Sequence, residues 1–136
     1  RTNLIDTGSL LIIDDCYNAN PVSMKASIDV LSKAPGRKIA VLGDMGELGT
    51  DEKKLHHIVG EYFADKGIDL LYCTGTLSEE IADAVREYSR ETEVHYCKNK
   101  EELMDELIKE VKKGDTVLVK ASHFMGFPEI VKKLTM

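Results

Sequence analysis

Long apolar runs are missing from this sequence of 136 residues. No segment approaches the roughly 20 consecutive apolar residues that a helix needs to span a bilayer. The first residues, RTN, do not start a secretory signal either. We therefore expect no membrane insertion and a cytoplasmic setting.

Cysteine and positive charge are also scarce. Cys16, Cys73 and Cys97 are odd in number and lack the close pairing of a C-x-x-C motif, so neither a disulfide framework nor a zinc site is expected. Lys and Arg total 18 against 24 Asp and Glu, a formal charge of −6. This excess of acidic residues argues against a nucleic-acid-binding surface, and any anionic ligand must be held locally.

The composition that is present suits one soluble domain covering residues 1–136. Hydrophobic residues make up 43% and charged residues 31% of the chain, as in ordinary globular proteins. Expected strands cover 3–6, 9–15, 39–42, 69–73, 93–97 and 116–120, and the expected helices begin near residues 21, 51, 76, 99 and 128. Strands separated by helices require crossover connections, so the sheet should be mostly parallel. We predict an α/β fold, a three-layer Rossmann-like sandwich with an N-terminal hairpin or antiparallel edge strand.

Two helix starts carry capping signals. Asn20 precedes Pro21, which is the pattern of an N-cap followed by proline at the first helical position. Thr76 and Glu79 form a T-x-x-E sequence and predict a capping box for the helix that runs to about Tyr88. Both patterns help to place the loops that follow the strands.

Three polar clusters follow expected strands: residues 14–20, 43–49 and 120–123. The carboxyl ends of parallel strands meet at one edge of the sheet, where α/β proteins bind ligands. We therefore predict a ligand site built from all three clusters. In the first cluster, Asp14 and Asp15 cannot form a catalytic dyad, because neighbouring residues of a strand point to opposite faces.

The second and third clusters offer charged groups of opposite sign. The glycines at 43, 46 and 49 match neither G-x-G-x-x-G nor the P-loop, so a flexible turn is favoured over a phosphate cradle. Asp44 and Glu47 in this turn are candidates to receive an ammonium group. Lys120 could bind a carboxylate or phosphate with Ser122 and His123, or it could simply be solvated.

The three motifs resemble a known family. DDCYNANPVSM at 14–24, VLGDMGELG at 41–49 and VLVKASHFM at 117–125 are similar to the C-terminal domain of the Mur ligases. The third motif departs from the family pattern, with Ala121 where glycine is usual and His123 where arginine is usual. The resemblance covers essentially the whole chain.

The resemblance implies an ATP-dependent amide-bond ligase of peptidoglycan precursor synthesis. The motifs are most similar to members that add D-alanyl-D-alanine to UDP-N-acetylmuramoyl-tripeptide through an acyl phosphate. It implies that a central domain binds most of the ATP and Mg²⁺, while this domain closes over ATP and positions the dipeptide. It further implies a monomer, a larger multidomain protein, and no catalytic residue or metal ligand in this chain, which should be inactive alone.

Site residues follow from the same resemblance. The nucleotide would contact Arg1, Asp15, Tyr17 and Asn18. The acceptor substrate would contact Asn20, Asp44, Met45, Glu47, Lys120, Ser122 and His123.

Two other readings of the sequence are open. The first is a stand-alone regulatory α/β domain that binds a small ligand without catalytic activity, which the absence of a P-loop and of a nucleophile-base pair supports. The second is a Rossmann dehydrogenase, which is disfavoured because the first core strand leads into YNANP rather than a glycine-rich turn. The missing initiator methionine favours a domain of a larger protein over the first reading.

Overall fold

A computed structural model describes residues 2–136, so the nucleotide contact predicted for Arg1 lies outside the described residues. The elements in chain order are β1 (Asn3–Asp6), β2 (Leu11–Asp15), α1 (Pro21–Ser32), β3 (Lys38–Leu42), η1 (Gly49–Asp51), α2 (Glu52–Phe63), β4 (Leu70–Thr74), α3 (Ser78–Tyr88), β5 (Glu93–Cys97), α4 (Lys100–Glu110), β6 (Thr116–Lys120), η2 (His123–Met125) and α5 (Pro128–Leu134). None of the helices in residues 2–136 has both the length and the apolar composition needed to cross a bilayer.

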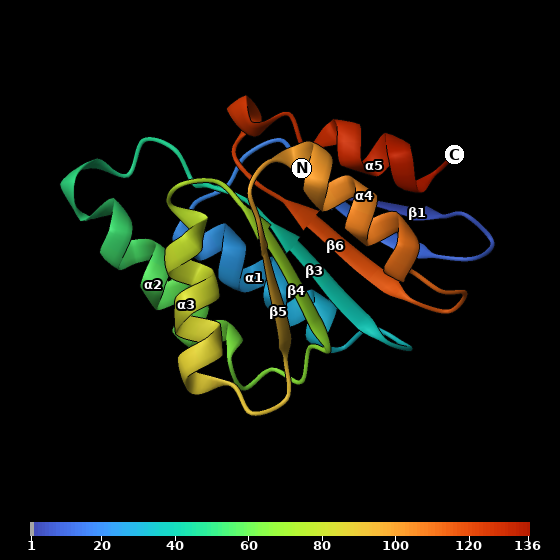
Figure 1. Cartoon of the computed structure of the whole chain (residues 1–136), viewed down its shortest axis with the longest axis horizontal. Coiled ribbons are helices and arrows are strands. Elements are labelled where there is room, and N and C mark those ends of the chain that lie inside the picture. The colour runs from blue at the N-terminus through green and yellow to red at the C-terminus, as the bar shows by residue number, and fades with distance from the viewer. Residues whose placement is uncertain (1) are drawn as a thin grey trace.

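One twisted sheet of six strands organises the fold, in the order β1-β2-β6-β3-β4-β5 (Figure 1). Strand β1 pairs antiparallel with β2 as an N-terminal hairpin, and the other neighbouring strands pair in parallel. The predicted α/β sandwich with an antiparallel edge strand is therefore confirmed. In this order β6 lies between β2 and β3, which brings the ends of the three motif-bearing strands side by side.

Helices cover both faces of the sheet and create two hydrophobic cores. Alternate strand residues such as Ile13, Ala40 and Leu118 face α1, α2 and α3. Their neighbours, such as Ile12 and Ile39, face α4 and α5. Parallel strands that are buried on both faces read as continuous apolar runs, which explains the sequences of β3 and β6.

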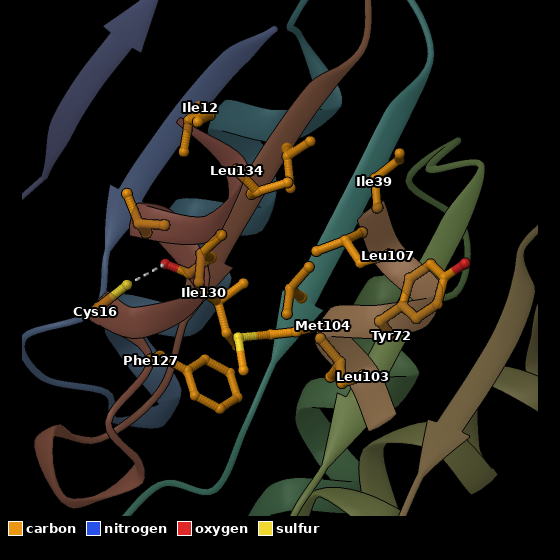
Figure 2. Packing of buried hydrophobic residues seen from close by; sticks show 14 of the residues in the cluster. Ile12, Cys16, Ile39, Tyr72, Leu103, Met104, Leu107, Phe127, Ile130 and Leu134 are labelled. Atoms are coloured by element: carbon orange, nitrogen blue, oxygen red, sulfur yellow. Dashed lines mark hydrogen bonds between the residues drawn. The ribbon is translucent and has the colours of Figure 1, made fainter. Parts of the chain in front are cut away.

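Figure 2 shows the second core, in which α4 and α5 pack on the sheet. The residues labelled there are Ile12, Cys16, Ile39, Tyr72, Leu103, Met104, Leu107, Phe127, Ile130 and Leu134. Cys16 is 3% exposed and donates from Sγ to the Val119 carbonyl at 3.5 Å. Burial raises the pKa of its thiol, so Cys16 packs as a small hydrophobic residue in the protonated form.

The two predicted capping patterns have different outcomes. Asn20 accepts a hydrogen bond from the Ser23 amide at 2.9 Å, with Pro21 beginning α1 as expected. The capping box of Thr76 and Glu79 is wrong, because α3 begins at Ser78 and its N-cap residue makes no side-chain cap bond. A carboxylate from another loop replaces it, as described below.

Close packing of α2 on α3 depends on Gly60. A Cβ at this position would lie 2.6 Å from the carbonyl oxygen of Ile81 and 2.6 Å from the Cβ of Ala84. The two helices therefore approach at a distance that only glycine allows.

We expect Gly60→Ala to lower the free energy of unfolding by about 1 kcal/mol or more, because overpacking outweighs the better helix propensity of alanine. Urea denaturation of the chain measures this change. Lys54→Ala, at an exposed position of the same helix, serves as the control and should leave stability nearly unchanged. An increase in the stability of Gly60→Ala would contradict this account, because it would show that α2 and α3 can move apart without cost.

Candidate functional site

The carboxyl ends of β2, β6 and β3 bring three loops together, and we call this region the carboxyl edge. Hydrogen bonds join the loops directly. The Ser122 amide donates to the Asp44 carbonyl at 2.9 Å, and the Gly43 amide donates to the Lys120 carbonyl at 3.0 Å. The convergence that chain order predicted is therefore present in the structure.

A buried ion pair lies under these loops. Lys120 Nζ is 2.7 Å from Asp15 Oδ2, and it also donates to the Asn18 carbonyl at 3.0 Å. Ser27 of α1 donates to the same carboxylate oxygen at 2.6 Å. Lys120 is 1% exposed and Asp15 5% exposed, so the reading of Lys120 as a solvated strand-end lysine is wrong.

The surroundings of Asp15 favour its ionised form. Burial by itself would raise the pKa of this carboxyl, but the hydrogen bonds from Lys120 and Ser27 outweigh it, and the net effect is a lowered pKa. The lysine charge is thereby compensated inside the fold. The pair fixes the end of β2 and the following loop against β6.

Asp44 makes a different structural contact. Its Oδ1 accepts hydrogen bonds from the amides of Leu77 at 3.1 Å and Ser78 at 2.7 Å, at the N-terminus of α3. A negative charge is favourable there because the helix dipole is positive at that end. A Cβ at Gly75 would clash with this carboxylate, so the glycine permits the approach.

The residues after Asp44 are fixed by two further side chains. The Met45 amide donates to His56 Nε2 at 2.9 Å, and the Gly46 amide donates to Ser122 Oγ at 2.7 Å. His56 is fully buried, and its Nδ1 lies 2.6 Å from the Glu52 carbonyl. The imidazole is therefore in the tautomer with the proton on Nδ1.

Three hollows open along the carboxyl edge. The first, of about 300 Å³, is lined by residues that include Asp15, Asn18, Asn20, Ser23, Ser27 and Lys120. The second, of about 520 Å³, is lined by Asp14, Cys16, Tyr17, His123 and Pro128. The third, of about 340 Å³, is lined by Asn18, Gly46, Glu47, Ser122, His123 and Phe124, and we call it the loop hollow. Asn18 and His123 each line two of these hollows, so the three are neighbours.

The aspartates of the first motif line different hollows. Asp15 lines the first and Asp14 the second, as expected for adjacent strand residues. Tyr17 and His123 approach each other across the second hollow, with ring centroids 5.8 Å apart and planes tilted by 57°. Two residues for which the family resemblance implies separate ligands thus line the same hollow.

Ala121 lies in the core and outside the hollows. It is fully buried, and a Cβ at Gly43 would lie 2.9 Å from the Ala121 Cβ and 2.6 Å from the Phe127 ring. Alanine at position 121 is larger than the glycine that is usual in the family. It fits here because the neighbouring residue, Gly43, has no side chain.

The predicted residues that line the hollows differ in what else their side chains do, because Asn20, Lys120 and Ser122 line hollows and also hold local structure. Tyr17, Asn18, Glu47 and His123 are exposed and line hollows. The side chains of Asn20, Asp44, Lys120 and Ser122 hold local structure through the bonds above, and Met45 is fully buried. His56 and Ser27 were not predicted to belong to the carboxyl edge. Their contacts form only through tertiary packing, and no local sequence pattern indicates them.

Comparison with known proteins agrees with this architecture. The family described as "Mur ligase, glutamate ligase domain" matches residues 1–123. The UDP-N-acetylmuramoyl-tripeptide–D-alanyl-D-alanine ligase of Bacillus subtilis (strain 168) is 39% identical over 137 residues, which cover 98% of this chain and 30% of that protein.

Solved structures extend the similarity to three dimensions. The MurF ligase of Thermotoga maritima, in complex with ADP, superposes with a TM-score of 0.81 at 32% identity, covering 98% of this chain and 30% of that one. A MurF structure from Acinetobacter baumannii gives a TM-score of 0.83 at 28% identity, with coverage of 98% and 30%.

These matches, together with the fold and the three converging motifs, show that the chain belongs to the Mur ligase family. Within that family its similarity is to the MurF ligases. The chain spans about 30% of the length of these relatives.

We expect Asp44→Ala to lower the free energy of unfolding by about 1–2 kcal/mol, because the first amides of α3 lose their acceptor. Asp44→Asn should lose less, since an amide oxygen can still accept. Urea denaturation measures both, with the exposed Asp65→Ala as control. Equal stabilities of the Ala and Asn variants would argue against the capping role.

The ion pair predicts a specific pH dependence. The lowered pKa of Asp15 contributes stability that is present above the unfolded-state pKa of about 3.9 and is lost as pH falls through the folded-state pKa. Asp15→Asn, which leaves Lys120 without its buried partner charge, should cost about 3–5 kcal/mol near neutral pH. The difference from wild type should shrink below about pH 4, as measured by denaturation across pH 2–7. A pH-independent difference would contradict this account.

Proposed function

We propose that this chain is the C-terminal domain of an ATP-dependent ligase that joins D-alanyl-D-alanine to UDP-N-acetylmuramoyl-tripeptide. The observation that carries the proposal is the convergence of all three motifs at one edge, where Ser122 and Lys120 bond to the other two loops. The names of the relatives, which contain these two substrates, support the proposal. The similarity to an ADP-bound structure supports the nucleotide.

In the proposed reaction the tripeptide carboxylate takes the γ-phosphoryl group of ATP and becomes an acyl phosphate. The dipeptide amine then attacks the acyl carbon. A C–N bond forms, the C–O bond to phosphate breaks, inorganic phosphate leaves, and the amine loses its extra proton. Catalysis of this kind depends on the positioning of the reactants and on charge stabilisation.

The residues of this chain fit the role of positioning the reactants. The chain has no P-loop sequence to hold the phosphates. The one metal-compatible group among the described residues combines Cys97 with Glu102 and Glu106, whereas Mg²⁺ prefers oxygen ligands. This group does not fit Mg²⁺, so we assign that ion and the phosphoryl transfer to the remainder of the ligase.

The hollows of the carboxyl edge supply surfaces on which the reactants could be positioned. We place the nucleotide against Asp15, Tyr17 and Asn18, and the acceptor dipeptide against the loop hollow with Ser122 and His123. In this arrangement the buried pair of Asp15 and Lys120 holds the loops in register. Movement of the whole domain would then bring the dipeptide to the acyl phosphate.

The test is the activity of the full-length ligase that carries this chain. We expect phosphate release that requires ATP, UDP-N-acetylmuramoyl-tripeptide and D-alanyl-D-alanine together, with L-alanyl-L-alanine as the control acceptor. Mass spectrometry of the product should show the tripeptide extended by two alanines. Ligation of a different acceptor, with D-alanyl-D-alanine inert, would refute the proposal.

A further inference from the structure

Glu47 has an unusual backbone conformation. Its φ is +61°, and it is the only non-glycine residue with positive φ in the described part of the chain. An L-residue in this left-handed region costs about 1–2 kcal/mol, so the surroundings must impose the conformation. The side chain itself gives no local compensation: it is exposed, and its carboxylate makes no hydrogen bond or ion pair within residues 2–136.

The three residues before Glu47 impose it. Asp44 is bonded to the N-terminus of α3, Met45 to His56 of α2, and Gly46 to Ser122 after β6. Two of these anchors, Asp44 and His56, are 7% and 0% exposed. The loop therefore reaches Glu47 from a backbone that is fixed by three separate elements.

Glu47 lies where a ligand would meet it. It lines the loop hollow together with Asn18, Ser122 and His123. Gly46 leaves this space open, because a Cβ there would lie 2.9 Å from the Phe124 ring and 3.5 Å from Ser122 Oγ.

The other carboxylates of the three motifs are engaged or lie elsewhere. Asp44 caps α3, Asp15 pairs with Lys120, and Asp14 lines the second hollow. Of these four acidic residues, only Glu47 lines the loop hollow. An ammonium group entering it would meet a carboxylate whose side chain starts from a backbone position that is already fixed.

We propose that Glu47 is the residue that selects the acceptor by binding its ammonium group in the loop hollow. This inference rests on the proposed function, which supplies an acceptor with a free amine. Glycine at this position would relieve the backbone strain but would remove the charge. The strain is therefore the cost of placing a carboxylate at this point of the loop.

The test compares two substitutions in the full-length ligase. Glu47→Gln keeps the size and removes the charge, and Glu47→Gly removes the side chain and relieves the strain. Both should raise KM for D-alanyl-D-alanine by about 10- to 100-fold, as expected for loss of a charge-assisted hydrogen bond. KM for ATP should stay within about twofold, and the melting temperature of Glu47→Gly should equal or exceed that of wild type.

A matched control and a modified ligand sharpen the result. Asp51→Asn removes an exposed carboxylate four residues along the chain, whose side chain makes no cap bond, and should leave KM for the dipeptide unchanged. Inhibition by N-acetyl-D-alanyl-D-alanine, which has no ammonium group, should be the same for wild type and Glu47→Gln.

The outcomes separate this inference from the proposed function. If the wild-type enzyme does not ligate D-alanyl-D-alanine but uses another amine whose KM rises in both Glu47 variants, the proposed substrate fails and the role of Glu47 stands. If wild type ligates the dipeptide and either Glu47 variant has an unchanged KM for it, the role of Glu47 is overturned. It is also overturned if Asp51→Asn raises that KM equally, or if Glu47→Gly melts below wild type.

Discussion

The buried ion pair between Asp15 and Lys120 is the contact on which the carboxyl edge depends. It joins the ends of β2 and β6, and the same ammonium group holds the Asn18 carbonyl of the first loop. A buried pair adds little to stability compared with an apolar replacement, but leaving one charge alone is costly. The pair therefore acts mainly by specifying how the loops are arranged, and the hollows take their shape from that arrangement.

The polar motifs perform two tasks with different residues. In one set, which includes Asp44 and Ser122, the side chains accept hydrogen bonds from backbone amides and so make the loops rigid. Another set, including Tyr17, Glu47 and His123, is exposed and lines the hollows. Rigid loops favour ligand binding in general, because less conformational entropy is lost when a ligand binds. Several of the acidic and amide residues in these motifs therefore have a structural role.

Much of the fold could be predicted because its signals are local. The apolar run before Asp14 marks β2, and Asn20 with Pro21 marks the start of α1. The start of α3 could not be found in this way. Its cap is a carboxylate 34 residues earlier in the chain, so Thr76 and Glu79 suggested a box that the fold does not use. Local hydrogen-bonding patterns compete with tertiary contacts, and here the buried carboxylate prevails.

The sequence by itself determined the alternation of strands and helices, the parallel sheet and the meeting of three polar clusters at one edge. These follow from periodicity and from the geometry of crossover connections, which involve near neighbours in the chain. Only the tertiary structure decided which polar side chains are engaged in hydrogen bonds and which are exposed beside the hollows. That decision rests on contacts between distant residues, such as Asp15 with Lys120 and Met45 with His56, which form only when the strands and helices pack.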